Sequence, residues 1–243
     1  MLRQLLSHTK LQILTGLRDP AYFFSTILLP AGVFWFFGVP EAKSDYIAVF
    51  LCCSFSAFSF FGVFFFQYSI STAQEKNSDW LFYLKTLPVK PHIVLIARFI
   101  TSTLLGILSC LLIYIITITM TPSQMTILTL LKLIGTLTLF SFPFLLMGLF
   151  LGNIFSAKAM VPVANFFHLV LSFAGGLWKP PEILPETIQK ISPLLPTYHY
   201  GMLVWPLANP KEMFVQWENI NYMVLFSLGM LFLLYLQKKY GKN

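Results

Sequence analysis

Six long apolar runs, separated by short polar stretches, dominate the pattern of hydrophobic and polar positions along the chain. Each run is close to or above the roughly 20 residues that a helix needs to cross the hydrocarbon core of a bilayer. The runs are continuous rather than alternating, which favours helices over the strands of a membrane barrel. The sequence therefore predicts six membrane-spanning helices, at Ala21–Gly38, Tyr46–Ser71, Val94–Thr119, Met125–Leu151, Ala159–Leu177 and Ile220–Gln237.

The composition supports the same fold class. Hydrophobic residues make up 57% of the 243 residues and charged residues only 10%, against roughly 25% charged residues in a soluble domain. A water-soluble fold of this size would leave large apolar patches exposed and would aggregate. We expect an all-α polytopic membrane protein that forms one transmembrane domain over residues 1–243.

The balance of charge indicates orientation. Lys and Arg outnumber Asp and Glu by 16 to 9, and in a membrane protein this excess reports topology rather than nucleic-acid binding. With the N-terminus inside, eleven of the 16 basic residues fall on the cytoplasmic side. We therefore expect both termini in the cytoplasm; we also expect the membrane to be a bacterial plasma membrane, which the charge balance does not itself decide. Arg98 and Lys132 lie near the ends of predicted spans, where we expect their side chains to snorkel to the interface.

Residues 1–20 form an amphipathic stretch before the first span, with leucines on one side and basic residues on the other. Such a stretch is typical of a helix that lies in the headgroup region beside anionic lipid. A simple anchor for the first span and a gating element are both compatible with it.

Residues 74–92 form a short, charged cytoplasmic connection that also has an apolar side. Asn77 or Ser78 can cap a helix there, Asp79 suits its first turn, and Pro88 helps to end it. Apolar residues recur at steps of three and four, at Trp80, Leu81, Leu84 and Leu87. The pattern fits either an interfacial helix or a surface on which a soluble partner docks.

Residues 178–219 form the longest connection on the opposite side, which we expect to be extracellular. Its helical part is too short to span, so we expect a re-entrant or surface segment. Gly175 and Gly176 permit a sharp turn before it, and Glu182, Pro185 and Glu186 mark its helical part. We interpret its carboxylates as solvated loop charges rather than a catalytic or cation site.

Motifs for intrinsic chemistry are absent from the sequence. It contains no G-x-x-x-x-G-K-[ST] phosphate loop, no HExxH pair and no Gly-x-Ser-x-Gly elbow. The sequence therefore predicts no catalytic residue, no metal site and no cofactor on this chain. A GxxxG at Gly148–Gly152 allows close helix approach, within one subunit or between two.

Three stretches in order resemble the membrane subunits of ATP-binding-cassette exporters of the type-2 permease class. Leu17–Gly38 resembles that family's connecting helix entering the first span, and Gln74–Phe99 its first cytoplasmic loop before the third span. Gly175–Leu207 resembles its outer re-entrant segment, which is followed by a Pro-Thr-Tyr run. The resemblance covers nearly the whole chain, although Asn77-Ser78-Asp79 departs from the family's Gly-rich, more basic loop.

The resemblance implies a function and a set of partners. The cytoplasmic loop would be a coupling helix that docks on a separate ATPase subunit, which binds ATP and Mg²⁺. The docking residues would be Glu75, Lys76, Asp79, Trp80, Leu81, Leu84 and Lys85. A second permease, a copy or a paralogue, would complete the path by which a drug, antimicrobial peptide or lipid-like compound leaves the membrane.

Two other classes remain open from the residues. The first is an ion-coupled transporter, which would need intramembrane carboxylates or broken helices in paired halves. The second is a non-transporting sensor or assembly component that uses the same docking helix.

The second span carries four regularly spaced phenylalanines, which could face an amphiphilic substrate, lipid or neighbouring helices. These are Phe55, Phe58, Phe61 and Phe65.

Overall fold

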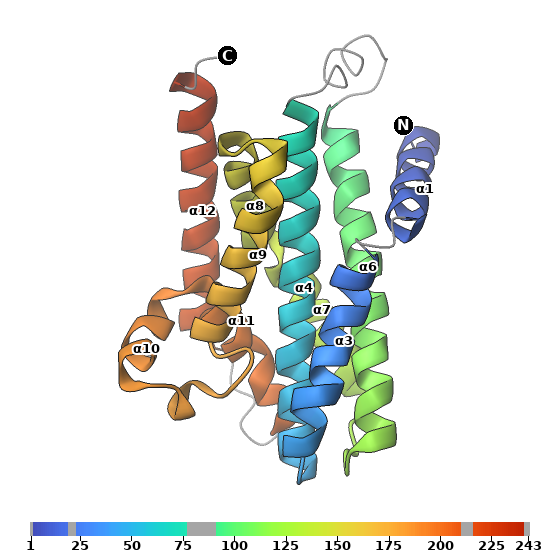
Figure 1. The fold of residues 1–243 in the computed structure, drawn as a ribbon, viewed down its shortest axis with the longest axis vertical. Helices are drawn as coiled ribbons and strands as arrows, with labels where there is room; N and C mark the ends of the chain where they lie inside the picture. The colour runs from blue at the N-terminus through green and yellow to red at the C-terminus, as the bar shows by residue number, and fades with distance from the viewer. Residues whose placement is uncertain (1, 19–22, 77–90, 210–215, 241–243) are drawn as a thin grey trace.

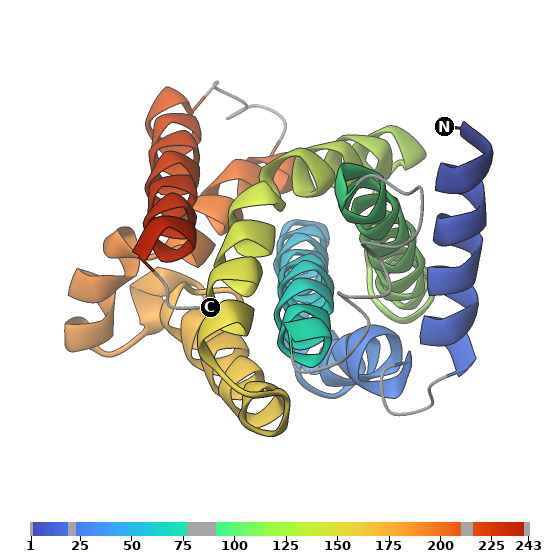
Figure 2. The same cartoon turned by 90° about the horizontal axis from the view of Figure 1, so that it is seen from above.

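Helix α4 (Asp45–Lys76) runs through the centre of a helical bundle, and the other long helices surround it (Figure 2). In this computed structural model, residues 2–18, 23–76, 91–209 and 216–240 are described. The apolar window of α4 is 89% buried, as expected of a helix that is hydrophobic on all sides. Phe58, Phe61 and Phe65 are fully buried and Phe55 nearly so, so these rings pack against neighbouring helices.

The described part of the chain is almost entirely helical and contains no strand. Within these described residues, five helical segments are long and apolar enough to cross a membrane. These are α4, α6 (Pro91–Met120), α7 (Ile127–Phe140) joined to α8 (Phe142–Ile154), α9 (Ala157–Ala174) and α12 (Trp217–Tyr240). The prediction of an all-α polytopic membrane protein is confirmed.

The first predicted span is described only in part, because residues 19–22 lie outside the described residues. Its helical run is described over residues 23–41, of which Thr26–Glu41 is a short apolar helix. The run combines the α-helical turn α3 (Leu29–Val33) with π-helical turns at Phe24–Leu28 and Phe34–Gly38 and a 3₁₀ turn at Val39–Glu41. It packs along α4 and α6 (Figure 1).

The amphipathic N-terminal stretch forms α1 (Leu2–Arg18), which lies along the outside of α6 (Figures 1 and 2). Thr101 on α6 donates a hydrogen bond to the side-chain oxygen of Gln12. Leu6 of α1 is about three-fifths exposed, so part of the apolar side of this helix faces outward. That exposed apolar side suits a helix in contact with lipid, while its position in a bilayer stays a prediction.

The fourth predicted span is broken at Ser141, between α7 and α8. Pro143 has no N–H to donate to the Leu139 carbonyl oxygen four residues earlier, so the helical ladder is interrupted here. Nearby, the Leu137 carbonyl oxygen accepts from the hydroxyls of Ser141 and Tyr200, at 2.6 and 2.9 Å. Tyr200 is fully buried, so a side chain from a distant part of the chain contacts the backbone beside the break.

The segment after α9 folds beside the half of α4 that begins at Asp45 (Figure 1). It contains three 3₁₀ turns, at Pro181–Ile183, Ser192–Leu194 and Trp205–Ala208, and two short helices, α10 (Glu186–Ile191) and α11 (Pro196–Val204). Trp205 donates its indole N–H to the Ser54 hydroxyl of α4 at 2.7 Å and stacks on Phe50. These contacts attach the segment to the central helix.

Helices α8 and α4 approach closely along the GxxxG motif. A Cβ added to Gly148 would lie 2.8 Å from the Phe65 carbonyl oxygen, and one added to Gly152 would lie 2.6 Å from that of Ser69. Both contacts are with backbone atoms, which cannot rotate away. In this chain the motif therefore serves helix packing within one subunit.

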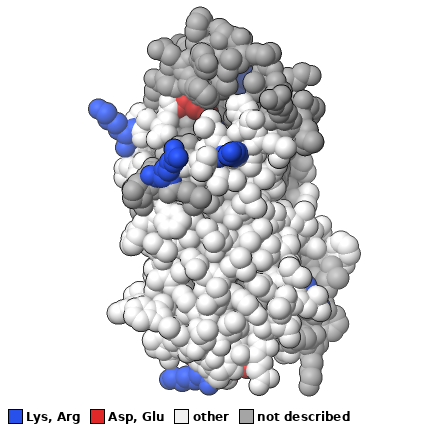
Figure 3. Space-filling view, turned by 90° about the vertical axis from the view of Figure 1, so that its right-hand side faces the viewer, with Lys and Arg blue, Asp and Glu red and all other residues white. Residues whose placement is uncertain are grey.

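Most charges lie toward the two ends of the bundle. On the face shown in Figure 3, Lys and Arg gather mainly near the ends of the long axis, and a broad band between them is almost free of charge. An apolar band of this kind matches the hydrocarbon region of a bilayer. The chain is a multi-pass membrane protein.

Substitution of Gly152 tests this packing. We expect Gly152→Leu to lower the melting temperature of the purified protein by several degrees, since overpacking costs about 1–3 kcal/mol. Gly229→Leu on α12 is the matched control, because a Cβ there meets no atom within 4 Å. Thermal unfolding in mild detergent compares the two, and equal melting temperatures would contradict close α4–α8 packing.

Candidate functional site

The end of the bundle at which α4 ends and α6 begins is the candidate functional site. The end of α12 lies at the same end of the molecule, and α1 lies beside it (Figure 1). Glu75 and Lys76 of the predicted docking set occupy the last turn of α4. The other members, Asp79, Trp80, Leu81, Leu84 and Lys85, lie outside the described residues, so docking by this set stays a prediction.

An ion pair joins α4 to α6 at this end. A guanidinium nitrogen of Arg98 lies 2.5 Å from a carboxylate oxygen of Glu75, and their side chains are only 4% and 25% exposed. The expectation that Arg98 snorkels to the interface is therefore wrong. A charge inside an apolar bundle is costly unless it is paired and hydrogen-bonded, and Glu75 supplies that partner from the neighbouring helix.

Tyr68 adds a second link between the same helices. The Arg98 guanidinium lies 5.7 Å from the centre of its ring, within the range of a cation–π contact. The Tyr68 hydroxyl donates to the Leu95 carbonyl oxygen at 3.0 Å. Helices α4 and α6 are thus fastened by one charged and one neutral hydrogen bond within the last three turns of α4.

Lys76 connects α4 to α8. Its ammonium donates to the Asn153 carbonyl oxygen at 2.6 Å, one residue before α8 ends at Ile154. Carbonyls in the last turn of a helix lack intrahelical partners and carry partial negative charge, so a cation is favourable there. Glu75 and Lys76 therefore both contact groups of this chain. Whether either also touches a soluble partner stays a prediction.

The predicted residues of the outer segment lie at the other end of the bundle. Gly175 and Gly176 follow α9, and Gly176 has a φ of +82°, which favours glycine. Pro185 precedes α10, and Glu186 is exposed in its first turn, where an acidic side chain suits the helix dipole. Glu182 lies in the 3₁₀ turn Pro181–Ile183 and lines a cavity with residues of α4.

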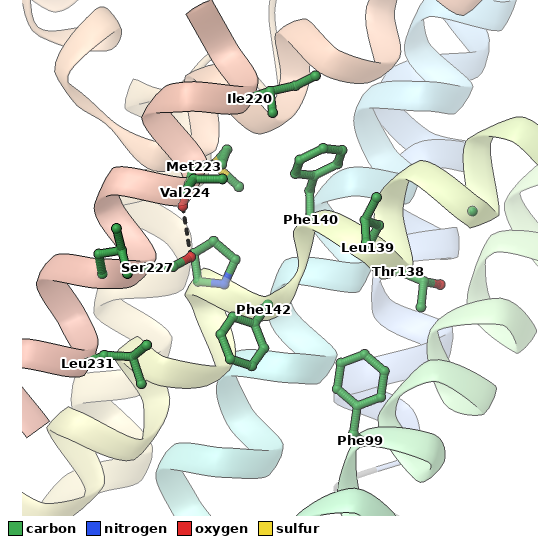
Figure 4. A pocket seen from close by; sticks show the side chains of 13 residues that line it. Phe99, Thr138, Leu139, Phe140, Phe142, Ile220, Met223, Val224, Ser227 and Leu231 are labelled. Carbon is green, nitrogen blue, oxygen red and sulfur yellow. Dashed lines mark hydrogen bonds between the residues drawn. The ribbon is translucent and has the colours of Figure 1, made fainter. Parts of the chain in front are cut away.

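A second hollow lies between α6, α7, α8 and α12 and measures about 940 Å³ (Figure 4). Phe99, Leu139, Phe142 and Leu231 are typical of its lining, which is apolar except for Thr138 and Ser227. The Ser227 hydroxyl donates to the Met223 carbonyl within its own helix. This hollow offers hydrocarbon contact and no charge, so it has little means of selecting one ligand over another.

The structure assigns roles to residues that the sequence left open. His168 of α9 is buried against α4, with its Nε2 3.1 Å from the Phe58 carbonyl oxygen and its ring stacked on that of Phe58. The close approach depends on Gly62, where a Cβ would lie 2.8 Å from His168 Nε2. Among the residues that could be searched, no three His, Cys, Asp or Glu side chains form a metal-binding group.

The Glu75–Arg98 pair gives a stability prediction. Arg98→Met takes the guanidinium away from a partly buried carboxylate, and we expect a loss of stability that is smaller than the roughly 3–5 kcal/mol for removing one partner of a fully buried pair. The double variant Arg98→Met/Glu75→Met removes both charges and should recover most of the melting temperature.

Thermal unfolding of the purified proteins in mild detergent measures these effects. Lys132→Met is the control, because Lys132 is an exposed basic residue of α7. If Arg98→Met unfolded at the wild-type temperature, the ion pair would contribute nothing to the α4–α6 junction.

Comparison with known proteins agrees with this architecture. The family described as "ABC-2 family transporter protein" matches residues 38–236, which is most of the chain. The chain is also 27% identical over 237 residues to the protein named "Putative transport permease YvfS" of Bacillus subtilis (strain 168), with 92% of each chain covered. No solved structure matches the chain. The chain therefore belongs to the ABC-2 family of transporter proteins, as a membrane permease subunit.

Proposed function

We propose that this permease is the membrane subunit of an ATP-driven exporter, powered by a separate ABC ATPase that docks on residues 74–92. ATP and Mg²⁺ would be bound by that ATPase. The family and the absence of a phosphate-loop motif from the sequence support this division of labour. The observation that carries the proposal is the junction of α4, α6 and α8 at the base of residues 77–90.

The junction makes mechanical coupling plausible in physical terms. A partner that displaces residues 77–90 pulls on α4 and α6, which are the helices on either side. The Glu75–Arg98 pair fastens α4 to α6, and Lys76 fastens α4 to the end of α8. These three helices would therefore move together, and two states with different affinity for the ATPase would give alternating access.

The other parts of the proposal concern the partners and the location. A second permease, either a copy or a paralogue, would complete the substrate path, and the apolar outer faces of α9 and α12 would contact lipid or that subunit. The substrate would be a hydrophobic or amphiphilic compound. We place the chain in a bacterial plasma membrane with both termini cytoplasmic, since α1 and the end of α12 lie toward the end of the bundle at which α4 ends and α6 begins (Figure 1).

A pull-down tests the docking role. We expect an ATPase to co-purify with the tagged wild-type protein in mild detergent and to be lost from the variant Trp80→Ala/Leu84→Ala, since buried aromatic and aliphatic anchors dominate such interfaces. The eluates are compared for ATP hydrolysis and for export by cells that carry each variant. Insertion into the membrane should be unchanged.

The matched control is Trp217→Ala/Leu225→Ala, which removes one Trp and one Leu that are about two-thirds exposed on α12. It should retain the ATPase. Unchanged transport by the correctly inserted Trp80→Ala/Leu84→Ala variant would rule out coupling through this segment. Absence of any ATPase from the wild-type eluate would favour an ion-coupled transporter or a non-transporting sensor or assembly component.

A further inference from the structure

A cavity of about 530 Å³ lies at the end of the bundle where α4 begins, opposite the end at which α4 finishes and α6 starts. Three parts of the chain form it: the end of the first apolar helix, the first turns of α4, and the turn that follows α9. All of its lining residues are described. Its volume is within the usual range for small-molecule sites, roughly 300–1,000 Å³.

Aromatic rings make up six of the thirteen residues that line this cavity. Trp178 lies at the centre of this wall, with its ring 5.5 Å from that of Phe58, 6.2 Å from Phe37 and 6.5 Å from Phe55. The cavity itself is lined by the rings of Phe37, Tyr46, Phe50, Phe55, Phe173 and Trp178. The faces of such rings carry partial negative charge and attract cations.

One polar atom in this wall is unsatisfied. The indole Nε1 of Trp178 is buried and has no hydrogen-bond partner among the described atoms. Because a water-sized molecule cannot reach this atom, the indole N–H points into the protein and offers no hydrogen bond to a guest in the cavity. Trp178 therefore contributes the face and edge of its ring to the lining.

Charged side chains surround the mouth of the cavity. Glu41 and Glu182 line it together with Lys179, and all three are exposed. Two carboxylates against one ammonium leave the lining with a formal charge of −1. Gln189 holds the Glu182 turn in place, because its side-chain amide donates to the Glu182 and Leu184 carbonyl oxygens at 3.0 and 2.7 Å. The acidic mouth is thus built on a fixed turn.

We propose that this cavity binds amphiphilic organic cations. The apolar body of the ligand lies among the aromatic rings, and its positive charge faces Glu41 and Glu182. An aromatic wall combined with carboxylates is the arrangement by which proteins bind ammonium-type ligands, whereas the hollow in Figure 4 has no charge to offer. The proposal that this cavity binds organic cations does not depend on the function proposed above. The further statement that such cations are the exported substrate rests on that proposed function.

Tetraphenylphosphonium and tetraphenylborate are the probes, because they share one shape and differ in charge. Equilibrium dialysis measures their binding to the purified full chain in nanodiscs of zwitterionic lipid, with empty nanodiscs subtracted. We expect saturable binding of one phosphonium ion per chain. Glu41→Gln/Glu182→Gln should weaken this binding by about tenfold or more, through loss of both carboxylates. Tetraphenylborate should show no saturable binding.

Two further variants sharpen the test. Glu186→Gln is the matched control, since this exposed carboxylate lies in the same outer segment and does not line the cavity; phosphonium affinity should be unchanged. We expect phosphonium binding to change the tryptophan fluorescence of the wild type through Trp178. Trp178→Phe keeps an aromatic ring but removes the indole, so this contribution of Trp178 to the fluorescence change should be lost. Melting temperatures confirm that each variant is folded.

The outcomes separate this proposal from the transport proposal. The cavity assignment is overturned if folded wild type binds no phosphonium saturably, if the double Gln variant binds it equally well, or if tetraphenylborate binds with equal affinity. Because no ATPase is needed, failure here with an ATPase retained in the pull-down leaves the transport proposal standing. Phosphonium binding without any co-purifying ATPase supports the cavity and removes the transport proposal.

Discussion

The burial of α4 on all its sides is the constraint on which the rest of the structure depends. The phenylalanine side chains of α4 point to all sides of the helix and are covered by the neighbouring helices. Five of them are fully buried: Phe58, Phe60, Phe61, Phe64 and Phe65. The first apolar helix, α6, α8, α9 and the outer segment all pack on this one helix. Where a neighbour must come closer than a side chain allows, a glycine permits it, as at Gly62, Gly148 and Gly152.

Polar groups in this apolar interior are arranged by the same constraint. A hydroxyl, indole or guanidinium that cannot reach water is costly to bury unless it has a hydrogen-bond partner. Arg98 finds Glu75, Trp205 finds Ser54, and Tyr200 reaches the Leu137 carbonyl at the break between α7 and α8. Each of these contacts joins segments that are distant in sequence, so satisfying polar groups also fixes the arrangement of the helices.

The two ends of the bundle differ in chemistry. At one end, charged side chains fasten α4, α6 and α8 to one another around residues 77–90. At the other end, rings and carboxylates from three segments enclose a cavity of about 530 Å³. Helix α4 connects the two ends: its first turns line the cavity, and its last turn carries Glu75 and Lys76. A displacement of α4 as a rigid helix would therefore move residues at both ends.

The sequence by itself determined the membrane class and the helices, because long charge-free runs leave the backbone no alternative to helix in a bilayer. Five predicted spans agree with the structure to within a few residues, and the resemblance to type-2 permeases agrees with the family match. The break at Ser141 lies two residues before Pro143, which lacks the N–H needed to continue a helix. Docking by Trp80, Leu81 and Leu84 lies outside the described residues and stays a prediction.

Only the tertiary structure decided which distant groups meet. Periodicity places Arg98 near the end of a span, and snorkelling is the default for such a residue; its burial depends on Glu75, 23 residues away on another helix. In the same way, Glu182 is an exposed loop carboxylate, but only the fold brings it into the lining of one cavity with Glu41 and Trp178. Local sequence sets which elements form, because the bilayer acts on each residue separately. Pairings across the bundle arise from packing, which no single segment specifies.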